Sequence, residues 1–188
     1  MDKYIFCKKR VVDRRTCDHI INIFEKEDVK FSQFNYDAFS PSFKELRFSF
    51  LKSLLIEHMY TYGKKHYFLL NNIYDWGLEE GFNIQRYQPG YAYSGEHAEH
   101  GSDDYNSPRC VAWMIYLNDI KKAGGTHWPQ QKFTTKPRAG DLYMWPAAWT
   151  HSHYGIEAPK EIKYIMTGWY SWIGRKEGGH FMRRKEDV

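Results

Sequence analysis

The residues whose types and spacing best suit chemistry are His97 and Glu99, two positions apart in the segment YQPGYAYSGEHAE. Side chains of an extended segment alternate between two faces, so this imidazole and this carboxylate point the same way. Further along, the segment PAAWTHSHYG offers His151 and His153. Two histidines and one carboxylate can meet on one face of a metal ion and leave its opposite positions open, as in non-haem Fe(II) sites. The spacing therefore predicts a metal centre.

Two of these ligand positions have alternatives. His151 and His153 would share one face of a strand, so geometry alone does not say which of them binds the metal. If Glu99 is not the carboxylate ligand, Asp103 and Asp104 are the candidate replacements. A lone His-x-Glu pair also arises by chance in a chain with nine histidines, and the imidazoles would then be surface or core groups.

A lysine begins the last expected strand, at residues 163–173. With the two-residue period of a strand, one face carries Lys163, Ile165, Thr167, Trp169 and Ser171. A lysine on an aromatic-rich central strand needs an anion as its partner. The alternative is an edge lysine whose stem is buried and whose ammonium reaches solvent.

From Phe82 onward the sequence consists of short extended runs separated by turn signals. The runs are residues 82–87, 96–100, 109–117, 132–135, 141–145, 150–154 and 163–173. The turns are Pro89-Gly90, Asn118-Asp119, Gly124-Gly125, residues 137–140 and Ala158-Pro159. This pattern predicts a double-sheet jelly roll, in which strands distant in sequence meet at the mouth of the barrel.

The first part of the chain is different, because it predicts helices. A short strand is expected over residues 4–12, then a helix capped by Thr16 with Cys17, Ile20, Ile21 and Phe24 on one side. Ser40-Pro41 is expected to open a longer helix. Its apolar stripe would be Phe43, Leu46, Phe50, Leu51, Leu54 and Leu55. Both stripes must be buried, so the helices are expected to lie against the sheet.

Composition favours one mostly β (α+β) domain. The 188 residues contain no linker, repeat or low-complexity run, and 18% of them are aromatic, a residue class that suits pleated surfaces. We expect helical support over residues 1–75, a jelly-roll core over 76–175 and a basic tail over 176–188.

Net charge and cysteine content indicate which partners and which cellular compartment suit the protein. The formal charge is +4, and its excess lies in two terminal clusters, Lys8, Lys9, Arg10, Arg14, Arg15 and Arg175, Lys176, Arg183, Arg184, Lys185. These could hold phosphates, but solvated terminal charge is the favoured interpretation. Three cysteines without C-x-x-C spacing favour a reduced compartment. No signal peptide or membrane span is recognisable, so a cytoplasmic protein is expected.

Over residues 87–172 the chain resembles the prolyl 4-hydroxylase-like branch of the Fe(II)/2-oxoglutarate dioxygenases, in its bacterial and phage form. The motifs that carry the resemblance are YQPG, HAE, RCVAWMIYLND, GGTHWP, KPRAGDLYMWPA, HSHYG and KYIMTGWYSW. It departs from the branch at Glu99, where many members have Asp, and in a gap from Tyr87 to His97 that is one residue longer than in the prolyl hydroxylases themselves. The added methylene of a Glu still allows it to ligate.

The resemblance implies a double-stranded β-helix and assigns residue roles by position. Iron would be bound by His97, Glu99 and His153, because the interval from His153 to Lys163 is the one that the family uses. His151 would lie nearby, where it would support a metal ligand or the fold. Lys163 would bind the far carboxylate of 2-oxoglutarate. Tyr87 and Thr126 would donate hydrogen bonds to this co-substrate, and the substrate entrance would be formed by Arg109, Trp169, Tyr93 and Tyr91.

The implied activity is hydroxylation of a C–H bond with Fe(II), 2-oxoglutarate and O2, with ascorbate as a candidate further cofactor. The substrate expected from the family is a polypeptide, oxidised at prolyl residues. Alternatives are the same chemistry on a nucleic acid or small molecule, a cupin-type metal protein that does not use 2-oxoglutarate, and a binding protein on a decayed oxygenase scaffold. The expected setting is the cytosol of a bacterium or of a phage-infected host.

Overall fold

The computed structural model describes residues 3–32, 36–66, 75–173 and 181–182. The helical elements are α1 (Arg14–Phe24), α2 (Ser49–Lys65) and the short 3-10 helices η1 (Leu46–Phe48) and η2 (Trp149–His151). The strands are β1 (Phe6–Lys8), β2 (Lys30–Ser32), β3 (Tyr36–Phe39), β4 (Trp76–Glu79), β5 (Asn83–Tyr87), β6 (Arg109–Tyr116), β7 (Thr126–Trp128), β8 (Phe133–Thr134), β9 (Leu142–Pro146), β10 (Tyr154–Gly155), β11 (Lys163–Trp172) and β12 (Phe181–Met182).

The described strands form two antiparallel sheets. The larger has the order β1-β9-β6-β11-β5-β3-β2, with β4 paired to β11 and β12 to β4, and the smaller has the order β10-β7-β8. Strands that are distant in the chain lie side by side in this sheet. For example, β5 pairs with β11. The expectation of a mostly β double-stranded β-helix with supporting N-terminal helices is confirmed.

The central strands each divide their side chains between two hydrophobic cores, as a two-residue period requires. Val111, Trp113 and Ile115 of β6 pack in the core that faces the helices. Ala112, Met114 and Tyr116 of the same strand pack inside the barrel. β9 divides in the same way, so the large sheet is one wall between a helical layer and the barrel interior.

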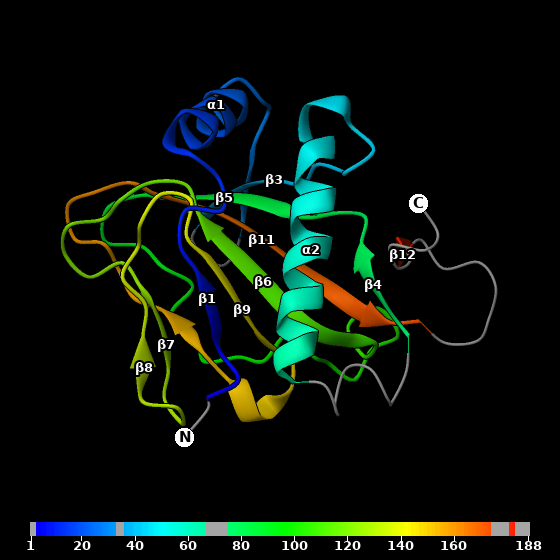
Figure 1. Ribbon diagram of the computed structural model, residues 1–188. Coiled ribbons are helices and arrows are strands. Elements are labelled where there is room, and N and C mark those ends of the chain that lie inside the picture. Colours follow the sequence, from blue (N-terminus) through cyan, green and yellow to red (C-terminus); the bar gives the residue numbers. More distant parts are fainter. Residues whose placement is uncertain (1–2, 33–35, 67–74, 174–180, 183–188) are drawn as a thin grey trace.

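The helices cover the outer face of the large sheet (Figure 1), and α2 runs across it in front of β6, β9 and β11. The cap of α1 is Asp13 and not Thr16, because the Asp13 carboxylate accepts a hydrogen bond from the Thr16 backbone N–H at 2.7 Å. The apolar face is as expected, with Cys17, Ile20 and Phe24 buried.

The longer helix begins at Ser49 and not at Ser40-Pro41 as predicted, a difference of eight residues. Residue 42 makes an isolated bridge to Gly81, and Leu46 belongs to η1, where it is 90% exposed. Phe50 is also exposed, so it does not belong to the buried stripe. Leu51 and Leu55 are fully buried as expected.

Two expected strands are wrong, and both carry candidate ligands. Residues 96–100 form no strand but make one isolated bridge, between His97 and His153. Residues 150–154 contain the last two residues of η2 and only the first residue of β10. Five described strands had no sequence prediction, namely β2, β3, β4, β7 and β12. Short segments of this kind are set by tertiary pairing and not by their own periodicity.

The described residues include no membrane-spanning helix and no disulfide bond. No described helix is long and apolar enough to cross a membrane. Cys7, Cys17 and Cys110 are free thiols. The predicted basic tail lies almost entirely outside the described residues.

Candidate metal and co-substrate site

The two candidate imidazole ligands are joined through their backbones. The His97 N–H donates to the His153 carbonyl at 3.0 Å, and the His153 N–H donates to the His97 carbonyl at 2.8 Å. Residues paired in this way project their side chains to the same side of the ladder. The two rings accordingly lie 4.5 Å apart, centroid to centroid.

Glu99 completes the cluster from the same segment. Its backbone N–H donates to the Ala147 carbonyl at 3.1 Å, which anchors the segment to the end of β9. Its Oε1 lies 3.3 Å from His153 Nε2 and 4.0 Å from His97 Nε2. The candidate ligand atoms of these three residues all lie within 4.8 Å of one another. The extended geometry predicted for His97 and Glu99 is therefore reached without a regular strand.

Backbone carbonyls fix the protonation of both rings. His97 Nδ1 lies 2.9 Å from the Gly95 carbonyl, and His153 Nδ1 lies 3.0 Å from the His151 carbonyl. A carbonyl oxygen only accepts, so each Nδ1 carries a proton, and in the neutral ring it is Nε2 that has the free lone pair. Burial and the neighbouring His153 lower the pKa of His97, which favours this neutral form. The donor set thus fits a divalent first-row metal.

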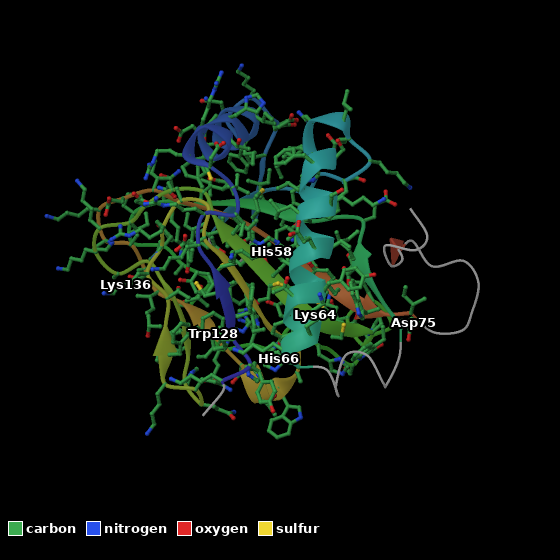
Figure 2. The ribbon with its side chains drawn as sticks, in the orientation of Figure 1. His58, Lys64, His66, Asp75, Trp128 and Lys136 are labelled. Atoms are coloured by element: carbon green, nitrogen blue, oxygen red, sulfur yellow. The ribbon has the colours of Figure 1, made fainter. Side chains whose placement is uncertain are left out.

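Aromatic rings hold the imidazoles in place. Trp128 stacks on His153 at 5.5 Å, and Trp145 meets the same ring edge-on at 5.0 Å. Tyr93 packs on His97 at 4.1 Å between centroids. Trp128, labelled in Figure 2, projects from β7, one of the strands without a sequence prediction.

A cavity of about 380 Å³ joins this cluster to Lys163. The Lys163 side chain is 3% exposed, and its ammonium lies 4.6 Å from the centre of the Tyr87 ring and 3.4 Å from the Ile156 carbonyl. No carboxylate in the described part of the chain pairs with it. Burial therefore lowers the pKa of Lys163 to about 8. A buried cation without a charged partner is suited to an anionic ligand.

The two predicted co-substrate donors line the same cavity but already have protein partners. The Tyr87 hydroxyl donates to Gln85 Oε1 at 2.8 Å. The Thr126 hydroxyl lies 3.1 Å from the Tyr116 hydroxyl. Gln85 is a cavity residue that the sequence prediction missed, although it shares a strand face with Tyr87.

At the substrate side, Arg109 and Trp169 lie together. The guanidinium of Arg109 stacks 3.5 Å from the centre of the Trp169 ring, and both residues line the cavity. Tyr93 lines it as well. Tyr91 is 49% exposed and is not among the lining residues, so the structure does not bring it to this site.

The alternative ligands lie elsewhere. His151 is buried, with Nε2 at 2.9 Å from the Lys3 carbonyl and Nδ1 at 3.1 Å from the Thr150 hydroxyl. Asp103 accepts hydrogen bonds from its own turn, including the Asn106 side chain at 2.8 Å. Neither it nor Asp104 is in the candidate metal cluster of the described residues.

Comparison with known proteins agrees with this geometry. The profile of the 2OG-Fe(II) oxygenase superfamily matches residues 82–171. No curated protein matches the chain in sequence. The fold is similar to that of a viral collagen prolyl hydroxylase from Paramecium bursaria Chlorella virus-1, with a TM-score of 0.71, 18% identity and coverage of 92% of this chain and 97% of that chain.

Two further structures share the fold. A Pseudomonas putida prolyl-4-hydroxylase has a TM-score of 0.70 at 14% identity, over 91% of this chain and 94% of that one. A Trichoplax adhaerens prolyl hydroxylase in complex with a peptide fragment has a TM-score of 0.70 at 15% identity, over 89% and 83%. The sequence match identifies residues 82–171 as a 2OG-Fe(II) oxygenase domain, and the fold over most of the chain is similar to that of these prolyl hydroxylases.

Proposed function

We propose that the protein hydroxylates a C–H bond of a polypeptide, at prolyl residues, with Fe(II) held by His97, Glu99 and His153. The observation that carries the proposal is the single cavity lined both by this cluster and by the buried Lys163. A cupin-type metal protein that does not use 2-oxoglutarate would gain nothing from burying an unpartnered ammonium beside its metal site.

Each residue has a defined task in this proposal. The two imidazoles offer Nε2 lone pairs and Glu99 offers Oε1, all toward one point. Lys163 pairs with the far carboxylate of 2-oxoglutarate, and the Tyr87 and Thr126 hydroxyls turn from Gln85 and Tyr116 to donate to the same molecule. Iron and 2-oxoglutarate, when bound, supply dioxygen activation and oxidation of an unactivated C–H bond, with succinate and carbon dioxide as products. The protein orients the target carbon and excludes water.

The case for a prolyl substrate rests on the aromatic lining of the cavity. Tyr36, Tyr93 and Trp169 border it, and the exposed Tyr105 lies beside Arg109. A proline ring stacks on aromatic faces, and its restricted backbone lowers the ordering cost of binding. Proteins with this fold include the viral collagen prolyl hydroxylase and the peptide-bound prolyl hydroxylase described above.

The test is coupled turnover. The Fe(II)-loaded protein is incubated with 2-oxoglutarate and with proline-rich peptides, nucleic acid oligomers or free amino acids, with and without ascorbate, and succinate is compared with oxygen incorporated into each substrate. We expect stoichiometric coupling with peptides. Coupling with nucleic acid or amino acids alone would overturn the polypeptide substrate and keep the oxygenase. Absence of Fe(II) and 2-oxoglutarate binding would overturn the proposed site.

A further inference from the structure

The two oxygens of Glu99 have different surroundings. Oε1 faces the two candidate imidazoles, at 3.3 Å from His153 Nε2 and 4.0 Å from His97 Nε2. Oε2 accepts a hydrogen bond from the Trp169 indole N–H at 2.7 Å. An indole N–H only donates and cannot bind a metal, so this contact leaves Oε1 alone to face the imidazoles.

The indole itself is fixed by a chain of contacts. The Arg109 guanidinium stacks 3.5 Å from its ring centre, and Arg109 is 8% exposed. Arg109 Nε lies 3.4 Å from Glu79 Oε1, which also accepts from the Ser171 hydroxyl at 2.6 Å. Trp169 and Ser171 share one face of β11, so the strand supplies both ends of this chain of contacts.

The hydrogen bond from Trp169 restricts a carboxylate that a glutamate side chain would otherwise leave more mobile than an aspartate side chain does. Glutamate has one more rotatable bond than aspartate, so fixing its carboxylate costs more conformational entropy. A free carboxylate can also bind a metal through both oxygens and occupy an additional position. A hydrogen-bond donor on one carboxylate oxygen limits both the side-chain freedom and the binding through two oxygens. Hydrogen-bond partners of metal ligands orient those ligands, and their removal typically weakens metal binding on the order of 10-fold or more.

We propose that Trp169 is a positioning residue that holds Glu99 in a one-oxygen binding mode, and that Arg109 holds the indole in the required orientation. The inference rests on the proposed metal site. It gives Trp169 a role toward the metal ligand that is separate from contact with the substrate.

The test measures Mn(II) binding to the full chain by electron paramagnetic resonance, in the absence of 2-oxoglutarate and substrate. Trp169→Phe removes the N–H and keeps an aromatic ring, and we expect Mn(II) affinity to fall on the order of 10-fold. The matched control is Trp113→Phe. Trp113 is fully buried in the core that faces the helices, away from the cavity, and its indole nitrogen has no partner within the described structure. We expect this control to stay within about 3-fold of the wild type, since it loses no hydrogen bond to a ligand.

Urea unfolding of each variant separates metal affinity from loss of fold. If Trp169→Phe does not fold, Arg109→Lys tests the same chain of contacts, because lysine keeps the charge but loses the planar stacking surface. Affinity should then fall about 3-fold with Trp169 still in place. Unchanged affinity in the folded variant, or equal losses in Trp169→Phe and Trp113→Phe, would overturn the inference.

The failure of the proposed function gives a different result. A wild-type protein that binds no Mn(II) would overturn the metal site and this inference together. Binding that is lost in His153→Ala but unchanged in Trp169→Phe would overturn the positioning role alone.

Discussion

The two ends of the cavity handle buried charge in opposite ways. At the metal end, burial acts to raise the pKa of Glu99, but the His153 and His97 imidazoles and the Trp169 hydrogen bond outweigh it and lower this pKa to about 2. At the other end, burial alone lowers the pKa of Lys163 to about 8, since no carboxylate of the described chain faces it. At one end the protein supplies hydrogen-bond partners for the buried carboxylate, and at the other end it leaves the partner of the buried ammonium to a ligand.

The difference shows where the protein gives up stability for binding. A charge that is buried with partners contributes to the folded state, whereas a buried charge without a partner destabilises it. The buried Lys163 ammonium is therefore expected to lower the unfolding free energy of the ligand-free protein. Binding of a dicarboxylate is expected to restore it. The following predictions test this contrast.

The largest effect is expected at the metal end. Replacing His97, Glu99 or His153 singly with Ala should abolish stoichiometric Fe(II) binding, because two remaining ligands do not hold the ion. Anaerobic Fe(II) titration measures this. Full affinity in Glu99→Ala would show that the carboxylate ligand comes from another residue.

At the lysine end, Lys163→Met should weaken the binding of 2-oxoglutarate and leave the binding of Fe(II) unchanged. Loss of a charge pair in a desolvated pocket costs on the order of 2–5 kcal/mol, which corresponds to about 30-fold or more in Kd. Titration of the Fe(II)-loaded protein with 2-oxoglutarate measures the loss, and Fe(II) affinity is the internal control. Equal co-substrate affinity in variant and wild type would contradict the assignment of Lys163.

The same substitution should stabilise the ligand-free protein at neutral pH. The folded-state pKa of Lys163 is about 8 against an ordinary value of 10.5, so between these values the unfolded chain binds more protons and stability rises with pH. The shift corresponds to on the order of 3 kcal/mol as an upper value. Urea unfolding with chelator should show Lys163→Met to be more stable than wild type at pH 7, with the difference shrinking by pH 10. A variant less stable than wild type at pH 7 would argue against an uncompensated charge.

The smallest effect is expected for His151→Ala. This side chain is buried but bonds to Lys3 and Thr150, outside the candidate cluster, so its loss should cost about 1 kcal/mol of unfolding free energy and leave Fe(II) affinity within about 3-fold. Urea unfolding and Fe(II) titration measure the two quantities. Iron binding lost in His151→Ala but kept in His153→Ala would reverse the ligand assignment.

The sequence by itself was sufficient for the features with a strong local signal. The two-residue period placed Lys163, Ile165, Thr167 and Trp169 on one face of β11, and all four line the cavity. The motifs over residues 87–172 indicated the superfamily, and the turn signals indicated the jelly roll. These properties depend on alternation and residue type, which are encoded in neighbouring positions.

Tertiary structure decided the features whose local signal is weak. Residues 96–100 have no regular strand, and His97 faces His153 only because one bridge joins them across the barrel. The start of α2 moved to Ser49 because residues 41–43 hydrogen-bond to residues 80–82 in place of a helix turn. The contrast between a paired Glu99 and an unpaired Lys163 likewise depends on which side chains the folded barrel brings within a few ångströms, and sequence spacing does not contain that information.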